Sequence, residues 1–306
     1  MAARPVIEVE DLRKRYGSTV AVDGLSFQVR EREIFGLVGP NGAGKTTTIE
    51  CLEGLRRPDS GRVTVLGLNP ATEARALRPR IGSQLQESAL PSRIRVWEAL
   101  DLYASFYANP IEWRPLLERL GLAGAQNASF ADLSGGQQQR LFIALALVSR
   151  PEAVFLDEMT TGLDPHARRA IWQLIGEIRQ GGATVLLTTH FMEEAERLCD
   201  RVAIIDHGRL VAVGPPAELY GRLHSEARVV VRFQGDLNAH EVEKLPGVVR
   251  VEVEEGQVSV YGSASEITDP LIKLLATNGC LVKEIETERP NLEDVFLRLT
   301  DEKKVG

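Results

Sequence analysis

The sequence predicts an α/β protein with a mainly parallel sheet, followed by a smaller α+β unit. Up to about Tyr220, short apolar segments alternate with amphipathic segments at helical spacing, the order that gives a parallel sheet with helices on both faces. A glycine-rich turn follows the first fully apolar segment. After Leu223 the short segments follow the order β-α-β-β-α-β, which is typical of a ferredoxin-like unit. We therefore expect domains at residues 1–223 and 224–306.

Composition and charge narrow the class of protein. The chain has 306 residues, of which 43% are hydrophobic and 26% charged, so it can bury a core and is neither disordered nor fibrous. A net charge of −7 gives no basic field that would attract nucleic acid or anionic lipid. We expect no nucleic-acid partner.

Cysteine usage and hydropathy bear on the compartment. Cys51, Cys199 and Cys280 are far apart and lack metal-ligand spacing, which favours free, buried thiols in a reducing compartment. The longest apolar run, Leu141–Val148, is too short to cross a bilayer, and the N-terminus has no apolar stretch typical of a secretory signal. A membrane role would therefore require another chain.

The first domain contains three continuous apolar runs, which are typical of strands covered on both faces. These are Ile34–Val38, Ala153–Leu156 and Thr184–Leu187. Each run ends in polar residues, and ligands of open α/β sheets bind beyond the carboxyl ends of the strands. We therefore expect the three strands to bring their chemistry to one edge of the sheet.

Helices and the second domain follow from the same reasoning. Asp164-Pro165 predicts the start of an amphipathic helix that ends at Gly181-Gly182. Residues 90–150 are rich in helix patterns without strand signals and predict an inserted helical subdomain. Beyond it, the predicted strands and helices of the second domain are Arg228–Phe233, Ala239–Leu245, Val248–Val253, Val258–Tyr261, Glu266–Thr277, Leu281–Glu286 and Leu292–Leu299.

A phosphate-binding loop follows the first central strand and precedes a helix that begins near Thr46. Its residues are Gly39, Pro40, Asn41, Gly42, Ala43, Gly44, Lys45 and Thr46, with Thr47 next in the helix. The sequence fits the P-loop pattern in the strand-loop-helix context that the motif requires. Glycines let successive N–H groups face one anion, and the helix dipole adds positive potential. Lys45 is expected to reach the β- and γ-phosphates of ATP, and the Thr46 hydroxyl to bind Mg²⁺.

Two adjacent acids follow the second central strand. A carboxylate at Asp157 can hold Mg²⁺ and its waters, and one at Glu158 can orient or deprotonate the attacking water. Taken alone, the pair could instead be solvated loop residues, the less favoured interpretation. A P-loop at the same sheet edge strengthens the catalytic interpretation.

A further motif, Leu133-Ser134-Gly135-Gly136-Gln137, lies upstream of this acidic pair. Its residues predict a capped helix start, a second exposed N-terminus suited to an anion, although an ordinary capped helix would look the same. Together with the P-loop and Asp157-Glu158, the segment resembles the signature of ATP-binding cassette ATPases.

That resemblance implies roles that spacing alone does not give. In this family two cassettes pair head to tail, so Ser134, Gly135, Gly136 and Gln137 would meet ATP held by the P-loop of the other copy. The resemblance also assigns roles to four further positions. Tyr16 would stack on adenine, and His190 would bond the γ-phosphate. Gln86, with Gln84 as the less favoured candidate, would join the Mg²⁺ site to the helical subdomain, and Asp164 would signal between the two ATP sites.

The resemblance is closest to bacterial drug-resistance exporter ATPases of the daunorubicin type. It is carried by Asp157-Glu158-Met159-Thr160-Thr161-Gly162-Leu163-Asp164-Pro165 and by Asn291-Leu292-Glu293-Asp294-Val295-Phe296. Two positions depart from it. Met159 stands where most relatives have proline, which removes a φ restraint next to Glu158, and Arg32 stands where relatives have glycine, so a turn that needs a positive φ would be strained.

The resemblance implies the ATP-binding and ATP-hydrolysing subunit of an ABC transporter, a multidrug or antibiotic exporter. A homodimer of this subunit at the cytoplasmic face of the membrane would drive a separate permease. Catalysis would depend on Glu158, His190, Gln86 and Lys45. Two alternatives remain at this stage: a soluble cassette that acts on a ribosome or DNA, and a binding switch with little hydrolysis.

Overall fold

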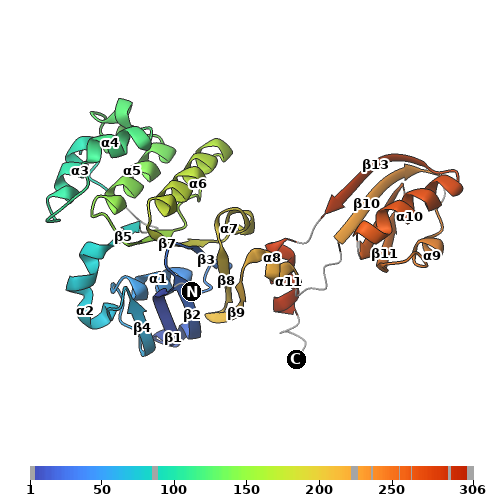
Figure 1. Ribbon diagram of the computed structural model, residues 1–306, viewed down its shortest axis with the longest axis horizontal. Coiled ribbons are helices and arrows are strands. Elements are labelled where there is room, and N and C mark those ends of the chain that lie inside the picture. Colours follow the sequence, from blue (N-terminus) through green and yellow to red (C-terminus); the bar gives the residue numbers. More distant parts are fainter. Residues whose placement is uncertain are drawn as a thin grey trace. The chain divides into compact units, whose positions relative to one another are not determined.

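The computed structural model describes residues 4–84, 89–221, 227–235, 237–254, 256–262, 264–288 and 291–301. The chain divides into two compact units, Met1–Pro216 and Ala217–Gly306 (Figure 1). The predicted limits of the ATPase domain (residues 1–223) and of the C-terminal accessory domain (residues 224–306) stay a prediction.

The first unit is organised around a six-stranded sheet in the order β5-β6-β7-β3-β8-β9. The first five strands in this order are parallel to their neighbours, and β9 is antiparallel to β8. The strands are β3 (Ile34–Val38), β5 (Ile81–Gln84), β6 (Ala153–Asp157), β7 (Thr184–Thr189), β8 (Arg201–Asp206) and β9 (Arg209–Gly214). Every residue of β3, β6 and β7 is buried, which confirms the three predicted central strands.

The register of these strands aligns their carboxyl ends. Val38 of β3 pairs with Thr189 of β7, and Asp157 of β6 pairs with Thr188. The residues that follow β3, β6 and β7 therefore emerge side by side, as expected for the ligand edge of an open parallel sheet.

A separate antiparallel sheet, which the sequence analysis did not distinguish, lies beside the parallel one. It has the order β2-β1-β4, built from β1 (Pro5–Tyr16), β2 (Thr19–Arg30) and β4 (Ser60–Val65). Its strands alternate between buried and exposed residues, as strands with one solvated face do. Helix α1 (Lys45–Leu52) contacts β2 and β4 as well as β6, so it lies between the two sheets (Figure 1).

The other face of the parallel sheet is covered by α5 (Gly135–Leu147), α6 (Pro165–Gln180) and α7 (Met192–Leu198) (Figure 1). The predicted helix after Asp164 is confirmed, with Gly181 as its C-cap. The helix-rich character of residues 90–150 is confirmed as well. The remaining short helices are α2 (Pro70–Leu77), η1 (Arg78–Arg80), α3 (Val96–Ala104), α4 (Trp113–Arg119), η2 (Ala123–Ala125) and η3 (Phe130–Asp132).

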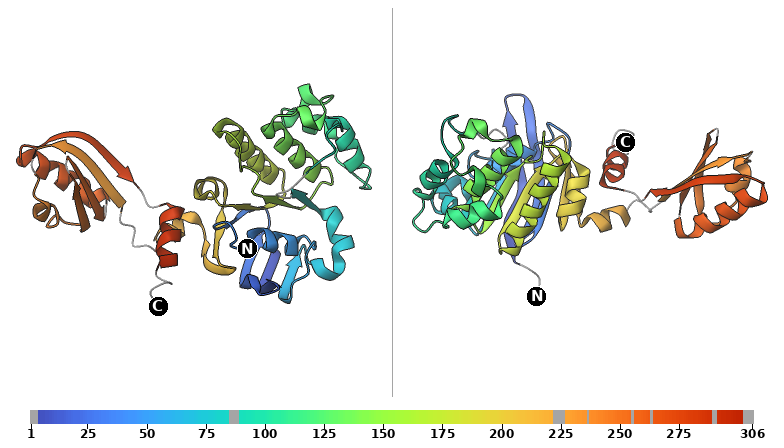
Figure 2. Two further views of the ribbon diagram at one scale, coloured as in Figure 1. Left: turned by 180° about the vertical axis from the view of Figure 1, so that it is seen from behind. Right: turned by 90° about the horizontal axis from the view of Figure 1, so that it is seen from above.

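The second unit has a four-stranded antiparallel sheet in the order β11-β12-β10-β13. With one helix after the first strand and one after the third, this is the predicted ferredoxin-like arrangement, and α10 packs on one face of the sheet (Figure 2). Its elements are α8 (Pro216–Gly221, which begins at the last residue of the first unit), β10 (Ala227–Gln234), α9 (Ala239–Val242), β11 (Val248–Glu254), β12 (Gln257–Gly262), α10 (Ala264–Thr277), β13 (Leu281–Glu288) and α11 (Leu292–Asp301).

Two expectations about the whole chain can be compared with the structure. Cys51, Cys199 and Cys280 are free and buried, as expected. Across the described ranges, no helix combines the length and apolar character needed to span a bilayer.

Candidate functional site

The loop after β3 has the backbone conformation that a phosphate cradle requires. Gly42 and Gly44 have φ of 81° and 98°, values that residues with a Cβ rarely adopt. Gly39 is needed for a different reason, because a Cβ there would lie 2.2 Å from the Ile205 carbonyl oxygen. Gly44 is also the N-cap of α1, so the first N–H groups of that helix have no partner within it and are available to an anion.

Lys45 places its ammonium inside this loop. Its Nζ donates to the Gly39 and Pro40 carbonyl oxygens at 2.8 and 3.0 Å and lies 3.1 Å from Glu158 Oε1. The side chains of both ion-pair partners are buried, at 4% and 7% exposure. A buried charge needs such partners, so the ammonium is held where an anion cradled by the loop would meet it.

The acidic pair after β6 lies beside the lysine, and Thr188 of β7 holds both acids. The Thr188 hydroxyl donates to Asp157 Oδ1, while the Glu158 N–H donates to the Thr188 hydroxyl oxygen at 3.1 Å. Burial raises the pKa of Asp157 above its usual value, and hydrogen bonds from Thr188 and Thr46 partly offset this rise.

Glu158 adopts a strained backbone and meets His190. Its φ is 47°, in the left-handed region that costs an L-residue about 1–2 kcal/mol. Glu158 Oε2 lies 3.3 Å from His190 Nδ1. Met159, the residue that departs from the family pattern, is buried at 3% exposure. The side chains of Lys45, Glu158 and His190, which come from three different strand ends, therefore form one contact chain.

The same edge can hold Mg²⁺. The Thr46 hydroxyl bonds to Asp157, so a hydroxyl and a carboxylate oxygen lie together next to the phosphate cradle. Mg²⁺ prefers such hard oxygen ligands, supplemented by waters and substrate phosphates, over a cage made entirely of protein groups. No cluster of three or more His, Cys, Asp or Glu side chains suited to a metal occurs in the described part of the chain.

Tyr16 lies at the end of β1 with an exposed ring. Its exposure is 41%, and the Lys14 ammonium and the Arg56 guanidinium lie 5.7 and 5.5 Å from the ring centroid. An exposed aromatic face flanked by cations is suited to stacking on a base of a charged nucleotide.

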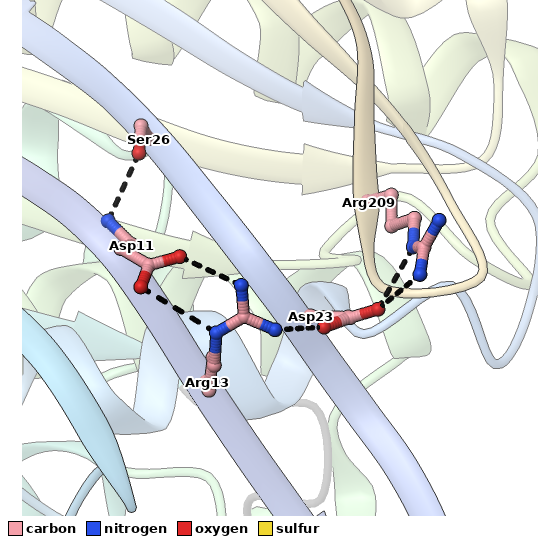
Figure 3. Close-up of polar contacts among 5 residues, drawn as sticks. All are labelled: Asp11, Arg13, Asp23, Ser26 and Arg209. Atoms are coloured by element: carbon pink, nitrogen blue, oxygen red, sulfur yellow. Dashed lines mark hydrogen bonds and ion pairs between the residues drawn. The ribbon is translucent and has the colours of Figure 1, made fainter.

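A network of ion pairs braces the hairpins next to the loop (Figure 3). Arg13 bonds to Asp11 and Asp23, and Asp23 also pairs with Arg209 of β9 at 2.6 Å. The Arg209 hydrogen bond in particular lowers the pKa of Asp23. In the turn just before Arg209, the Gly208 N–H donates to the carbonyl oxygen of Ala43 in the P-loop at 3.1 Å. The network therefore links β1 and β2 to the turn that supports the loop.

The Ser134 motif forms a capped helix start, as predicted. Ser134 is the N-cap of α5, and its hydroxyl accepts from the Gln137 N–H at 3.3 Å while the Gln137 side chain accepts from the Ser134 N–H at 2.9 Å. Asp164 caps α6 by accepting from His166 and Ala167 N–H groups, and these bonds, the Ala167 bond first, lower its pKa.

The structure brings these two capped starts together. Ser134, Gly135, Gly136 and Asp164 line a pocket of about 370 Å³. Its lining includes none of residues 39–47, a stretch that is described throughout.

Gln86 lies outside the described residues. Gln84, the less favoured candidate, is described: it is the last residue of β5 and is buried at 3% exposure. It lines a groove of about 430 Å³ together with Glu53, Tyr103 and Tyr107.

Sequence reasoning missed three participants. Thr188 follows the apolar run Thr184–Leu187 in the sequence, but its bridge between the two acids depends on the register of β6 and β7. Arg168 stacks on the Phe191 ring at 4.5 Å, and that ring lies 4.1 Å from the His190 ring. Glu53 is a charged residue directly after the apolar Cys51-Leu52, a break in pattern that could have signalled it.

The strand-loop-helix cradle and the acidic pair define a P-loop nucleotide-binding protein, and comparisons with known proteins specify the family. Residues 22–161 match the ABC transporter family. Residues 214–300 match a second family, described as the C-terminal domain of DrrA1-3-like ATP-binding proteins. The chain therefore belongs to the ABC transporter family, as an ATP-binding and ATP-hydrolysing subunit with a DrrA-like C-terminal domain.

Individual relatives span almost the whole chain. It is 40% identical over 299 residues to the Nod factor export ATP-binding protein I of Rhizobium etli, covering 96% of this chain and 93% of the relative. It is 38% identical over 312 residues to the daunorubicin resistance ATP-binding protein DrrA3 of Streptomyces coeruleorubidus, covering 99% and 98%. A solved ATP-binding subunit of an ABC transporter superposes with a TM-score of 0.65 at 30% identity, over 71% of this chain and 93% of that one.

Proposed function

We propose that two copies of this chain bind Mg-ATP between them at the cytoplasmic face of the membrane and drive a separate permease that exports drugs or antibiotics. The observation that supports this most is the contact chain from Lys45 through Glu158 to His190, because it joins the phosphate-binding group to the groups that would activate water.

In this proposal the P-loop residues Gly39 to Thr46, with Thr47, bind the phosphates, and Lys45 exchanges Glu158 for the β- and γ-phosphates. Freed from the ammonium, the Glu158 carboxylate accepts a proton from the attacking water, and His190 donates to the γ-phosphate. Thr46, Asp157 and Gln86 would hold Mg²⁺, which neutralises charge that develops on the phosphates. Tyr16 stacks on adenine.

The position of the signature supports the proposed dimer. Ser134 and Gly135 are exposed, and their pocket excludes the P-loop of the same chain. A helix N-terminus is suited to an anion, so the ATP that Ser134, Gly135, Gly136 and Gln137 would meet belongs to a second copy. Asp164 lines the same pocket and is placed to respond to that contact.

Export is inferred from the relatives. The printed names of the relatives above describe Nod factor export and daunorubicin resistance, and both relatives match this chain over both units. These names favour an exporter over a cassette that acts on a ribosome or DNA. The contact of Glu158 with His190 favours an ATPase over a switch that hydrolyses little.

Copurification and ATPase measurements test this function. The tagged chain, expressed in its own host and extracted in mild detergent, should copurify with a polytopic membrane protein, and reconstitution of that complex in vesicles should raise ATP hydrolysis above that of the chain alone. Copurification with ribosomes or DNA instead would contradict the proposal, as would an absence of ATP hydrolysis by the reconstituted complex.

A further inference from the structure

The groove that contains Glu53 is built from four segments of the first unit. Glu53 is the C-cap of α1, Ser83 and Gln84 belong to β5, Tyr103 lies on α3 with Tyr107 just beyond it, and Phe142 lies on α5. Side chains from all of them line an open groove of about 430 Å³. A water molecule occupies about 30 Å³ of liquid, so the groove has room for one or more side chains of a partner.

Glu53 is an acid without a counter-charge in this groove. It is 2% exposed, and neither carboxylate oxygen has a hydrogen-bond partner of regular geometry among the residues that the structure describes. Arg78 also lines the groove, but it is exposed and the structure records no ion pair between it and Glu53 within the described ranges. A buried carboxylate in this situation is costly unless it binds a cation or a proton.

The surroundings of Glu53 make the site more negative still. It lies at the C-terminal end of α1, where the helix dipole is negative, and the charges of Asp157 and Glu50 act on it. Burial raises the pKa of Glu53 to about 8; the nearby Ser83 hydroxyl offsets part of this rise, and the charges of Asp157 and Glu50 add smaller increases. Without a cation, the carboxyl is therefore kept largely protonated at neutral pH.

We propose that Glu53 binds a cationic side chain, arginine or lysine, that the membrane-spanning partner inserts into this groove. The inference rests on the proposed function, because it names the partner chemistry that the groove selects. The rings of Tyr103 and Tyr107 line the same groove, and aromatic faces favour a cation, a guanidinium most of all. A free metal ion would keep its waters and would leave the aromatic lining unused.

The position of Glu53 gives this contact a route to the ATP site. Helix α1 begins at Lys45 in the phosphate cradle and ends immediately before Glu53. A cation bound to Glu53 also replaces the proton that the carboxyl holds, and this proton passes to solvent. Assembly with the permease near pH 7 should therefore release close to one proton per Glu53, a signal that a merely structural carboxyl would not produce.

The test uses the full chain and the membrane protein that copurifies with it. Glu53→Gln keeps the shape of the side chain, and Glu53→Arg reverses its charge. Glu50→Gln removes a partly buried acid on α1, the helix that Glu53 caps; the Glu50 carboxylate pairs with Arg56. Loss of one partner of a buried charge pair should weaken assembly about thirtyfold or more in both Glu53 variants. Glu50→Gln should assemble normally, and ATP affinity of the isolated Glu53→Gln chain should be unchanged.

Two further measurements make the outcome specific. Calorimetry of assembly in buffers of different ionisation enthalpy should show proton release for the wild type and none for Glu53→Gln. Changing one arginine or lysine in the cytoplasmic segments of the permease to glutamate should restore assembly with Glu53→Arg.

Normal assembly and partner-stimulated ATP hydrolysis of Glu53→Gln would overturn the inference while the proposed function stands. Failure of the wild-type chain to assemble with any membrane protein would instead refute the proposed function.

Discussion

The Lys45 ammonium lies 3.1 Å from the Glu158 carboxylate, with both side chains buried. The lysine proposed to bind phosphate and the proposed general base thus satisfy each other, so we expect nucleotide to compete with Glu158 for Lys45. This exchange connects ATP binding to the release of the base.

Lys45→Ala should abolish tight ATP binding. The variant removes the cation that the cradle presents and leaves the Glu158 carboxylate without its partner, so we expect affinity to fall by about a hundredfold or more. Equilibrium titration with a fluorescent ATP analogue measures the effect. The control is Arg62→Ala, which breaks an exposed ion pair with Glu10 on the three-stranded antiparallel sheet and should retain wild-type affinity. Equal loss of affinity in both variants would contradict the role of Lys45.

Arg32→Gly should stabilise the protein. Arg32 has φ of 60°, as expected from a turn where relatives have glycine. Its N–H donates to Thr184 and its carbonyl accepts from Arg179, and glycine retains both groups. Relief of the left-handed strain is worth about 1 kcal/mol of unfolding free energy. Denaturant titration should show this gain for glycine and none for Arg32→Ala, which keeps the Cβ; the same result for both would exclude strain as the cause.

Stability should depend on pH through Glu53. Its pKa is raised to about 8 in the folded chain from an ordinary value near 4.5 when unfolded, so between these values the folded state holds the extra proton. The free energy of unfolding therefore falls as pH rises through this window.

Glu53→Gln removes that dependence, and its stability relative to wild type should improve by on the order of 3 kcal/mol between pH 5 and pH 8. Chemical denaturation at both pH values measures the change. Glu50→Gln should show no comparable improvement, and a pH-independent difference between Glu53→Gln and wild type would refute the burial argument.

Arg168→Ala should slow turnover while ATP affinity stays unchanged. The Arg168 guanidinium lies 4.5 Å from the centroid of the Phe191 ring, and the Phe191 and His190 ring centroids lie 4.1 Å apart. We therefore expect Arg168 to act by positioning His190. A contact of this kind is worth about 0.5–2 kcal/mol, which predicts a fall in kcat of roughly two- to thirtyfold with KM nearly constant. The exposed neighbour Arg169 provides the matched control, and an equal effect of Arg169→Ala would remove Arg168 from this role.

Much of the fold could be predicted because the signals were local. The fully apolar runs identified β3, β6 and β7, Asp164-Pro165 and Gly181 marked the ends of α6, and the order of short segments identified the ferredoxin-like sheet. The three-stranded antiparallel sheet was not distinguished, since its pairing joins Pro5–Tyr16 to Ser60–Val65 over a long sequence separation, and half-buried strands give a weaker pattern.

The candidate site likewise contains residues that local sequence signals identify and contacts that depend on tertiary structure. Lys45, Asp157 and Glu158 could be predicted because motif and strand context coincide in sequence. The bridge made by Thr188, the stack of Arg168 on Phe191 and the isolation of Glu53 depend on register and burial, which no short motif encodes. The positive φ of Glu158 likewise arises from tertiary structure, whereas that of Arg32 was anticipated from the glycine of the relatives.

The most direct test of the account is the assembly state of Glu158→Gln with ATP. This variant keeps the cradle, Lys45 and the signature but lacks the base that activates water, so ATP should remain bound between two copies. Analytical ultracentrifugation should show a stable dimer with Mg-ATP and a monomer with Mg-ADP, together with loss of ATP hydrolysis. A Glu158→Gln protein that stays monomeric with ATP, or that hydrolyses ATP at the wild-type rate, would contradict the account.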